Sequence, residues 1–328
     1  MKHDTSDLSS YLLKKKINKM VQKFFLTCLI SGMCFAILYP IIKLFPTVFS
    51  DLEDLGNPDV IWIPIKNSVL SFRAAYRMMM KSGIMTLVWS ILYSIAIMAV
   101  QVFISALVGY ALARVEFFGS KIIFFFVIFT FLVPPQTLLL SQYIHFKNFD
   151  FFGIIQLLTN DTIDMINRPV TLFLLAIFGF GLNQSLFIFM FRQFFKNIPK
   201  ELEEAALIDG CNFNKTYFKI MIPNAKPIIS TVAVLGFVWN YGDTYFTGYF
   251  HPDGPYLSYI LETVFRFANK NFILDALKAW YKLPLVSDFS FDAVKQAAAL
   301  IFLIPLLIVY FISQKWLVEN LETSGIVG

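Results

Sequence analysis

Long apolar stretches recur along the chain and are separated by shorter polar segments. Five of them reach the roughly 20 residues that a helix needs to cross a bilayer, and they occupy residues 24–45, 83–113, 121–146, 169–195 and 294–316. A sixth stretch, residues 226–250, is interrupted by the polar run Asn240-Tyr241-Gly242-Asp243. Because backbone groups in lipid must satisfy their own hydrogen bonds, the pattern predicts an all-α integral membrane protein with about six transmembrane helices.

The composition agrees with this fold class. Of the 328 residues, 57% are hydrophobic and 15% are charged, whereas soluble domains are about 45–50% apolar and about 25% charged. A water-soluble fold could not bury this surplus, which must therefore face lipid. The formal charge of +5 does not indicate a nucleic-acid partner, because the basic residues flank the apolar stretches.

The basic residues also predict the orientation of the chain. Four segments, residues 1–23, 114–121, 192–226 and 313–328, carry more than half of the 27 Lys and Arg residues but fewer than half of the 22 acidic ones. By the positive-inside rule these segments are cytoplasmic, which predicts a multi-pass protein of the cell membrane with both termini in the cytoplasm. The expected division is a cytoplasmic amphipathic segment attracted to anionic lipid (1–23), a transmembrane domain (24–316) and a cytoplasmic tail (317–328).

Lysines precede the first apolar stretch, so a cleaved signal peptide is the alternative there. The apolar run is too long for one, and no small-residue cleavage pattern follows it. We therefore expect residues 24–45 to remain as the first span.

Three segments are expected on the outer side. Residues 69–81 carry apolar and basic side chains on opposite helical faces, which predicts an amphipathic helix lying on the membrane surface. Residues 149–168 are expected to form an irregular loop. Residues 251–292 are too charged to span, but Ile273, Leu277 and Trp280 have helical spacing and predict a small external helix.

Side chains suited to catalysis or metal binding are sparse. The three cysteines and three histidines lack disulfide or metal-ligand spacing, and the sequence contains no G-x-x-x-x-G-K-[ST] phosphate loop. We therefore expect neither an enzyme nor a cofactor held on this chain. Arg114 and Lys121 are expected only to fix the topology.

The cytoplasmic segment between the fourth and fifth spans, residues 196–223, is not an ordinary connection. Pro199 suits the first turn of a helix, where its missing N–H costs nothing, and three glutamates follow where the helix dipole favours negative charge. Gly210 can end this helix in the left-handed conformation. A second short helix is expected to follow and to stop at Pro223, so the pattern predicts a helix–turn–helix projecting into the cytoplasm.

The spacing inside this segment resembles a family motif. It reads Glu204-Ala205-Ala206, three residues, Gly210, nine residues and Ile220-x-Ile222-Pro223. This is similar to the coupling loop of binding-protein-dependent ABC importer permeases, whose pattern ends in Leu-Pro. The chain also resembles the carbohydrate-uptake branch of this family, which contains the maltose permeases, at Tyr110–Arg114, Val133-Pro134 and Trp239-Asn240. The resemblance extends from about Gly83 to the C-terminus, although residues 261–292 exceed the family pattern.

The resemblance implies the type I ABC importer permease fold and a subunit without ATPase chemistry of its own. In this family the coupling loop docks on a separate ATPase subunit, which holds ATP and Mg. The implied assembly has a second permease subunit, expected to form a heterodimer, two ATPase subunits and an extracytoplasmic binding protein that delivers a sugar. The residues that the resemblance assigns to ATPase coupling are Leu202, Glu204, Ala205, Ala206, Leu207, Asp209, Gly210, Ile220 and Pro223.

A substrate path is predicted from polar side chains within the apolar stretches, because such groups are costly there and often line cavities. Aromatic rings beside hydrogen-bonding groups also suit a sugar. The alternative is that these groups hydrogen-bond between helices and that Trp and Tyr mark the membrane interface. The candidates are Gln136, Ser141, Gln142, Asn183, Gln184, Trp239, Asn240, Tyr241 and Asp243.

Other functions remain as alternatives to a sugar or oligosaccharide importer. A polyol or a glycerol derivative would fit the same class of permease. An ion-coupled secondary transporter would show inverted repeats and carboxylates near the membrane centre. A membrane enzyme would place His, Asp or Glu side chains opposite one another at membrane depth, and the sequence shows neither pattern.

Overall fold

The computed structural model describes residues 4–51, 54–57, 62–80, 82–266, 269–282 and 286–325. Within these residues all regular structure is helical, which confirms the predicted all-α class, and isolated β-bridges join Ser50 to Asn67 and Phe149 to Ile163. The chain divides into two compact units, residues 1–75 with 271–300 and residues 76–270 with 301–328.

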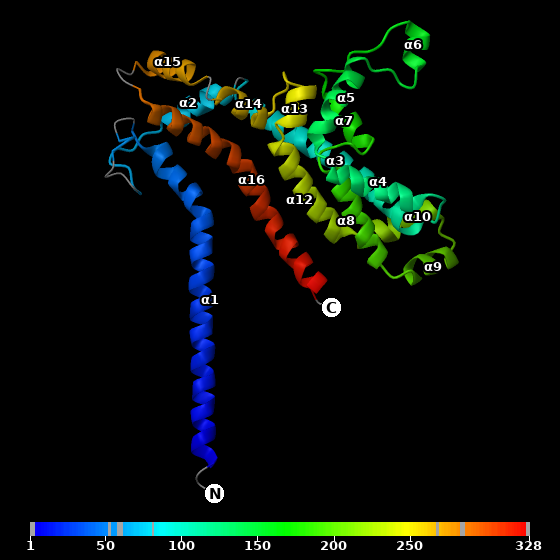
Figure 1. Cartoon of the computed structure of the whole chain (residues 1–328), viewed down its shortest axis with the longest axis horizontal. Helices are drawn as coiled ribbons and strands as arrows, with labels where there is room; N and C mark the ends of the chain where they lie inside the picture. The colour runs from blue at the N-terminus through cyan, green and yellow to red at the C-terminus, as the bar shows by residue number, and fades with distance from the viewer. Residues whose placement is uncertain are drawn as a thin grey trace. The chain divides into compact units, whose positions relative to one another are not determined.

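The helices are labelled in Figure 1 in chain order. They are α1 (Asp4–Phe49), α2 (Leu70–Met79), α3 (Ile84–Arg114), α4 (Ser120–Leu132), α5 (Pro135–Lys147), α6 (Ile154–Thr159), α7 (Pro169–Ile177), α8 (Gln184–Asn197), α9 (Glu201–Ile208), α10 (Phe213–Thr216), the π-helix η1 (Tyr217–Met221), α11 (Ile222–Asn224), α12 (Lys226–Gly242), α13 (Tyr245–Phe250), α14 (Leu257–Val264), α15 (Lys270–Tyr281) and α16 (Asp288–Gly325).

Three of these helices, α1, α3 and α16, are long and apolar enough on their own to cross a membrane. Two pairs meet the same requirement only as bent spans: α4 with α5, bent by 103°, and residues 213–224 with α12, bent by 75°. The predicted span 169–195 consists of α7 and α8 with residues 178–183 between them, and the span 226–250 divides into α12 and α13. Three of the six apolar stretches are therefore broken helices and not single ones.

The breaks have local causes. Val133 is extended because it precedes Pro134, and Pro135 then starts α5 at its first position. Between α7 and α8, Gly179 and Asn183 take positive φ angles of 83° and 53°, a conformation favourable for glycine and tolerated by asparagine.

At both ends of the chain the helices extend past the predicted spans. The expected surface-lying segment 1–23 is, from Asp4 onward, the first part of α1, which continues without interruption through the first apolar stretch. The expected tail 317–328 is helical to Gly325 as the end of α16. Both helices therefore continue well beyond the apolar stretches that predicted them.

Of the three segments predicted to lie outside, two contain the helix that was predicted. The helices predicted within 69–81 and around Ile273–Trp280 are confirmed as α2 and α15. The expected irregular loop 149–168 contains the short helix α6, and the bridge between Phe149 and Ile163 closes its two ends. That prediction was wrong because an Asp150 carboxylate oxygen accepts the backbone N–H groups of Ile155 and Gln156 and so caps α6.

The unit formed by residues 76–270 and 301–328 is built around α3, which packs along α8 and α12. Gly109 permits the close approach of α8, because a Cβ atom there would lie 2.6 Å from Cβ of Phe191. Gly236 does the same for α12, where an added Cβ would lie 3.1 Å from Cγ of Met98. Backbones that approach this closely are typical of helix packing in membranes, where small residues occupy the interface.

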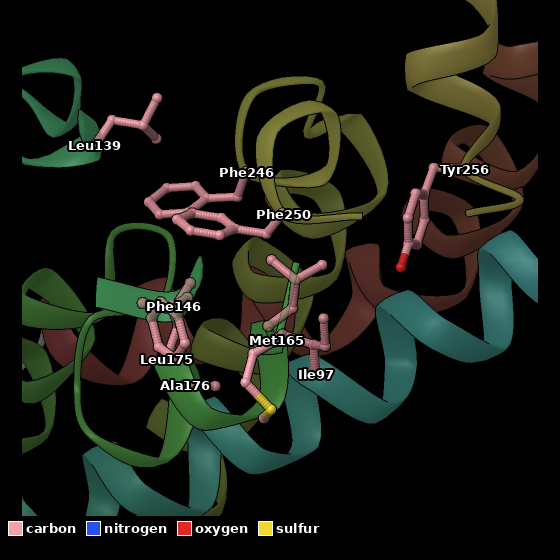
Figure 2. Close-up of a cluster of buried hydrophobic side chains, with 10 residues drawn as sticks. Ile97, Leu139, Phe146, Met165, Leu175, Ala176, Phe246, Phe250 and Tyr256 are labelled. Atoms are coloured by element: carbon pink, nitrogen blue, oxygen red, sulfur yellow. The ribbon is translucent and has the colours of Figure 1, made fainter. Parts of the chain in front are cut away.

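Among the residues described in this unit, two apolar clusters stand out. The Phe246 cluster, drawn in Figure 2, brings α5, α7 and α13 together, and the rings of Phe246 and Phe250 lie nearly parallel, 6.1 Å apart. The Tyr110 cluster brings α3, α8, η1 and α12 together. It consists of Ala106, Tyr110, Phe187, Phe191, Phe195, Tyr217, Met221, Ala225 and Val232.

The contact between α3 and α8 predicts a strong effect of Gly109→Leu. The added side chain must displace the backbone of α8, so we expect a loss of about 1–3 kcal/mol and a lower melting temperature in detergent, measured by thermal unfolding. Gly242→Ala is the matched control, since an added Cβ there meets nothing within 4 Å. Equal melting temperatures of the two variants would contradict the tight α3–α8 contact.

Candidate functional site

The segment 196–223 folds as α9, α10, η1 and α11 in succession. Gly210 ends α9 with φ +75°, as predicted. The N–H of Cys211 donates to the Ala206 carbonyl at 2.9 Å, and the N–H of Gly210 donates to the Leu207 carbonyl at 3.0 Å. These two bonds form a Schellman motif, which satisfies carbonyls that the helix end leaves open and fixes the turn.

The two prolines of this segment occupy other positions relative to the helix ends than predicted. Helix α9 begins at Glu201, so Pro199 lies outside its first turn, and the carbonyl of Lys200 accepts the first N–H groups. Pro223 does not stop the second helix, because it falls in the first turn of α11, where a missing N–H is tolerated. The bend of 75° follows at Ala225, between α11 and α12.

The exposed side of α9 differs from the face predicted for docking. Ala206 is only 2% exposed and points into the protein, whereas Leu202 and Leu207 are 42% and 60% exposed. Ala205, Glu204 and the other first-turn carboxylate Glu201 are also exposed. The predicted contact set therefore separates into an exposed group that a partner can reach and a single buried alanine that it cannot.

The remaining residues assigned to coupling lie along the same segment. Asp209, Gly210 and Pro223 are exposed and Ile220 is half-buried. The Asn212 side chain accepts the N–H of Lys215 at 2.9 Å and caps α10.

Arg114 holds the start of the segment against the end of α3. Its Nε lies 3.6 Å from Oε1 of Glu203, and the two side chains are 5% and 19% exposed. The guanidinium also donates to the carbonyl of Ile198. The expectation that Arg114 serves only the topology was therefore wrong. The spacing of the three glutamates in the sequence does not show that Glu203 is the one that turns inward.

Aromatic packing fixes the second half of the segment to the same place. The ring of Tyr110 on α3 lies 5.4 Å from Phe195, 5.3 Å from Phe213 and 5.0 Å from Tyr217. Tyr217 is only 2% exposed, so its ring lies inside this contact. Tyr110 thus joins α3 to α8, α10 and η1 at one point.

The structure brings two pairs of predicted path residues together: Asn240 and Asp243 line a pocket of about 20 Å³, and Gln142 and Asn183 form the second pair. Gln142 and Asn183 line a pocket of about 80 Å³ at the two breaks, α4–α5 and α7–α8. Gln142 and Ser141 also line an adjoining pocket of about 590 Å³. Gln136 is exposed in the first turn of α5.

The side-chain amides of Gln184 and Asn240 instead form hydrogen bonds to other groups of the protein. The amide of Gln184 bridges the α7–α8 break, donating to the Ala176 carbonyl at 2.7 Å and accepting the Gly181 N–H at 3.0 Å. Asn240 donates to Oε1 of the buried Gln101 at 2.7 Å and so joins α12 to α3. Such contacts are the helix-to-helix bonding given above as the alternative.

The aromatic and acidic candidates near residue 240 make comparable internal contacts. Trp239 stacks on Phe187 at 5.4 Å, and the buried Tyr241 stacks on Phe302 at 4.8 Å. The carboxylate of Asp243 accepts the N–H groups at the start of α13, from Tyr245 to Thr247, at 2.9–3.1 Å. It therefore caps a helix, and this explains the break between α12 and α13.

Both the sequence and the fold of this chain resemble those of known proteins. Residues 101–323 match the family described as binding-protein-dependent transport system inner membrane component. The arabinooligosaccharide transport permease AraQ of Halalkalibacterium halodurans is 25% identical over 241 residues, 73% of this chain and 72% of that protein. The melibiose/raffinose/stachyose import permease MelC of Bacillus subtilis is 27% identical over 228 residues, 68% of each.

A solved structure shares the fold. It is a bacterial ABC transporter involved in the import of the acidic polysaccharide alginate, and the superposition covers 92% of this chain and 96% of that chain with a TM-score of 0.62. The sequence identity is 20%, so the likeness concerns the fold alone.

The attachment at Arg114 predicts that Arg114→Met frees the start of the segment. Removing one member of a buried pair leaves the other unpaired, so we expect a loss of about 1–3 kcal/mol and faster tryptic cleavage at Lys200. Glu203→Gln should act similarly, and the double variant should cost less than the sum of the two. The exposed Glu201→Gln is the control, and faster cleavage in it than in Arg114→Met would refute the attachment.

Proposed function

The chain belongs to the family of binding-protein-dependent transport system inner membrane components, and from this we propose that it is a permease subunit that an external ATPase drives through residues 196–223. It is a multi-pass membrane protein and a transport component, not an enzyme. The observation that carries the proposal is the geometry of the segment, in which an exposed face of α9 stands on an anchor built from Arg114, Glu203 and Tyr110.

The exposed residues of α9 are suited to docking on a partner. Leu202, Ala205 and Leu207 offer an apolar surface with a small residue in it, which lets another backbone approach closely, and Glu204 stands ready to pair with a basic group. The Schellman turn at Gly210 sets the angle at which the chain leaves this surface. Asp209, Ile220 and Pro223 complete the segment, whereas Ala206 supports it from inside.

The partners follow from the class of transporter. We infer two ATPase subunits that hold ATP and Mg, a second permease subunit as a heterodimer partner, and an extracytoplasmic solute-binding protein. Both termini and the segment 196–223 then lie in the cytoplasm, in keeping with the basic residues near them. ATP and the binding protein bias one bistable permease between inward- and outward-facing states.

The cargo that fits best is a sugar or an oligosaccharide. Support comes from the relatives, among them permeases for arabinooligosaccharides and for melibiose, raffinose and stachyose. A polyol is the second candidate, since it presents the same hydroxyl groups. Uptake assays in vesicles that contain the whole transporter decide between them, and uptake driven by an ion gradient without ATP would refute both.

The positive φ of Gly210 predicts different effects for two substitutions at this position. No atom lies within 4 Å of an added Cβ, so any penalty is conformational. Valine tolerates a positive φ poorly, whereas asparagine is enriched there. We expect Gly210→Val to lose at least tenfold of the ATPase activity that the binding protein stimulates in proteoliposomes, and Gly210→Asn to keep most of it. Equal activities would discard the role of the turn.

The two neighbouring alanines give a second test. Ala205→Trp places a bulky ring on the exposed face, so the variant should fold and insert but fail to co-purify with the ATPase subunit in mild detergent. Ala206→Trp should instead reduce the yield of folded protein, because that site is buried. Asn148→Trp, exposed at the far end of α5, is the control for the added ring. Normal co-purification of Ala205→Trp would exclude this face as the docking surface.

A further inference from the structure

Two adjoining pockets run along one side of α5. The pocket of about 80 Å³ at the helix breaks and the pocket of about 590 Å³ beside residues 149–152 share Leu138, Gln142 and Phe180 in their linings. The larger volume falls in the range of sites that take small molecules, about 300–1,000 Å³. We name the two together the α5 groove.

The lining of the α5 groove combines polar and aromatic side chains. Helix α5 contributes the polar Ser141, Gln142 and His145 beside the apolar Leu138 and Phe146. Further aromatic rings come from Phe149 and from Phe178 and Phe180 at the end of α7 and the break after it. A sugar has apolar faces and a rim of hydroxyl groups, so it matches a lining in which aromatic rings accompany a few polar groups.

Gln142 stands where the two pockets meet, and its hydrogen bonding is incomplete. Its Oε1 is buried and has no hydrogen-bond partner among the described residues. Leaving such an acceptor unsatisfied costs about 1–3 kcal/mol. A hydroxyl group of a bound molecule supplies the missing donor, whereas a lipid acyl chain in the groove would leave the amide unsatisfied.

The position in the fold agrees with a transport site. The smaller pocket is lined from both sides by broken spans, with Val133 and Pro135 from the α4–α5 break and Gly181 and Asn183 from the α7–α8 break. Interrupted membrane helices are where transporters place their substrates, because backbone and side-chain polar groups become available there. Trp239, Tyr241 and Asp243 line neither pocket.

We propose that the α5 groove is the sugar-contact site of this subunit, with the Gln142 amide hydrogen-bonding a substrate hydroxyl and the Phe178 and Phe180 rings covering an apolar face of the sugar. This rests on the proposed transport function and names a residue that contacts the substrate. The groove extends from the helix breaks to residues 149–152.

The first test uses cysteine accessibility and does not depend on which sugar is carried. Cys28, Cys34 and Cys211 are replaced by serine, and Gln142→Cys is introduced into the whole transporter in proteoliposomes. We expect the charged thiol reagent MTSES to label position 142 and the rate to change at least fivefold when ATP and vanadate are added. Leu140→Cys is the control, because Leu140 is 70% exposed on the same helix but lines neither pocket.

Labelling at position 142 that is absent in every nucleotide state, or that equals labelling at position 140, would overturn the proposal. Stimulation of the ATPase by the binding protein is measured on the same vesicles. If stimulation is normal while the labelling pattern fails, the groove is wrong and the transport function stands. If stimulation is absent in the parent protein, it is the transport function that fails.

The second test measures affinity with tritiated raffinose, arabinotriose and maltotriose. For whichever sugar the parent transporter takes up, Gln142→Leu should raise KM at least tenfold with little change in kcat, and Gln142→Glu, which keeps an acceptor, should restore part of the loss. Leu140→Ala should leave KM unchanged. An unchanged KM in Gln142→Leu would overturn the assignment of Gln142.

Discussion

The firm attachment of residues 196–223 to the end of α3 is the constraint on which the rest of the structure depends. A segment that is moved by another subunit can transmit the movement only if it is held firmly to the rest of the protein. Three kinds of contact hold it here: the Arg114–Glu203 pair, the bond from Arg114 to the Ile198 carbonyl and the packing of the rings around Tyr110. They hold the two-turn helix α9, which would be marginal alone, against the packed helices α3 and α8.

From this attachment a contiguous path of packed helices leads to the helix breaks. Gly109 lets α3 and α8 pack closely, and Gln101 further along α3 is hydrogen-bonded to Asn240 and to the Leu182 carbonyl at the α7–α8 break. Asn183, at the start of α8, lines the same pocket as Gln142. Such a route gives a physical basis for coupling, which a two-state rearrangement of these helices has to complete.

Hydropathy and turn chemistry predicted the all-α class, the left-handed end of α9 at Gly210 and the helices α2 and α15. The breaks inside the spans were harder, since Pro134 and Gly179 are visible in the sequence but the direction of a bend depends on packing. The sequence also did not predict which of two neighbouring residues faces the interior. Glu203 and Glu204, like Ala205 and Ala206, are equivalent in pattern, and only the position of Arg114 and the Tyr110 cluster distinguishes them.

Site-specific photocrosslinking tests the central claim most directly. A benzoylphenylalanine at Leu207, which is 60% exposed on α9, is activated by light in the transporter purified in mild detergent, and one at Phe152, 88% exposed beside α6, serves for comparison. An adduct with the ATPase subunit from position 207 and none from position 152 is the result expected. No adduct from position 207, or one from position 152, would contradict the role of this segment.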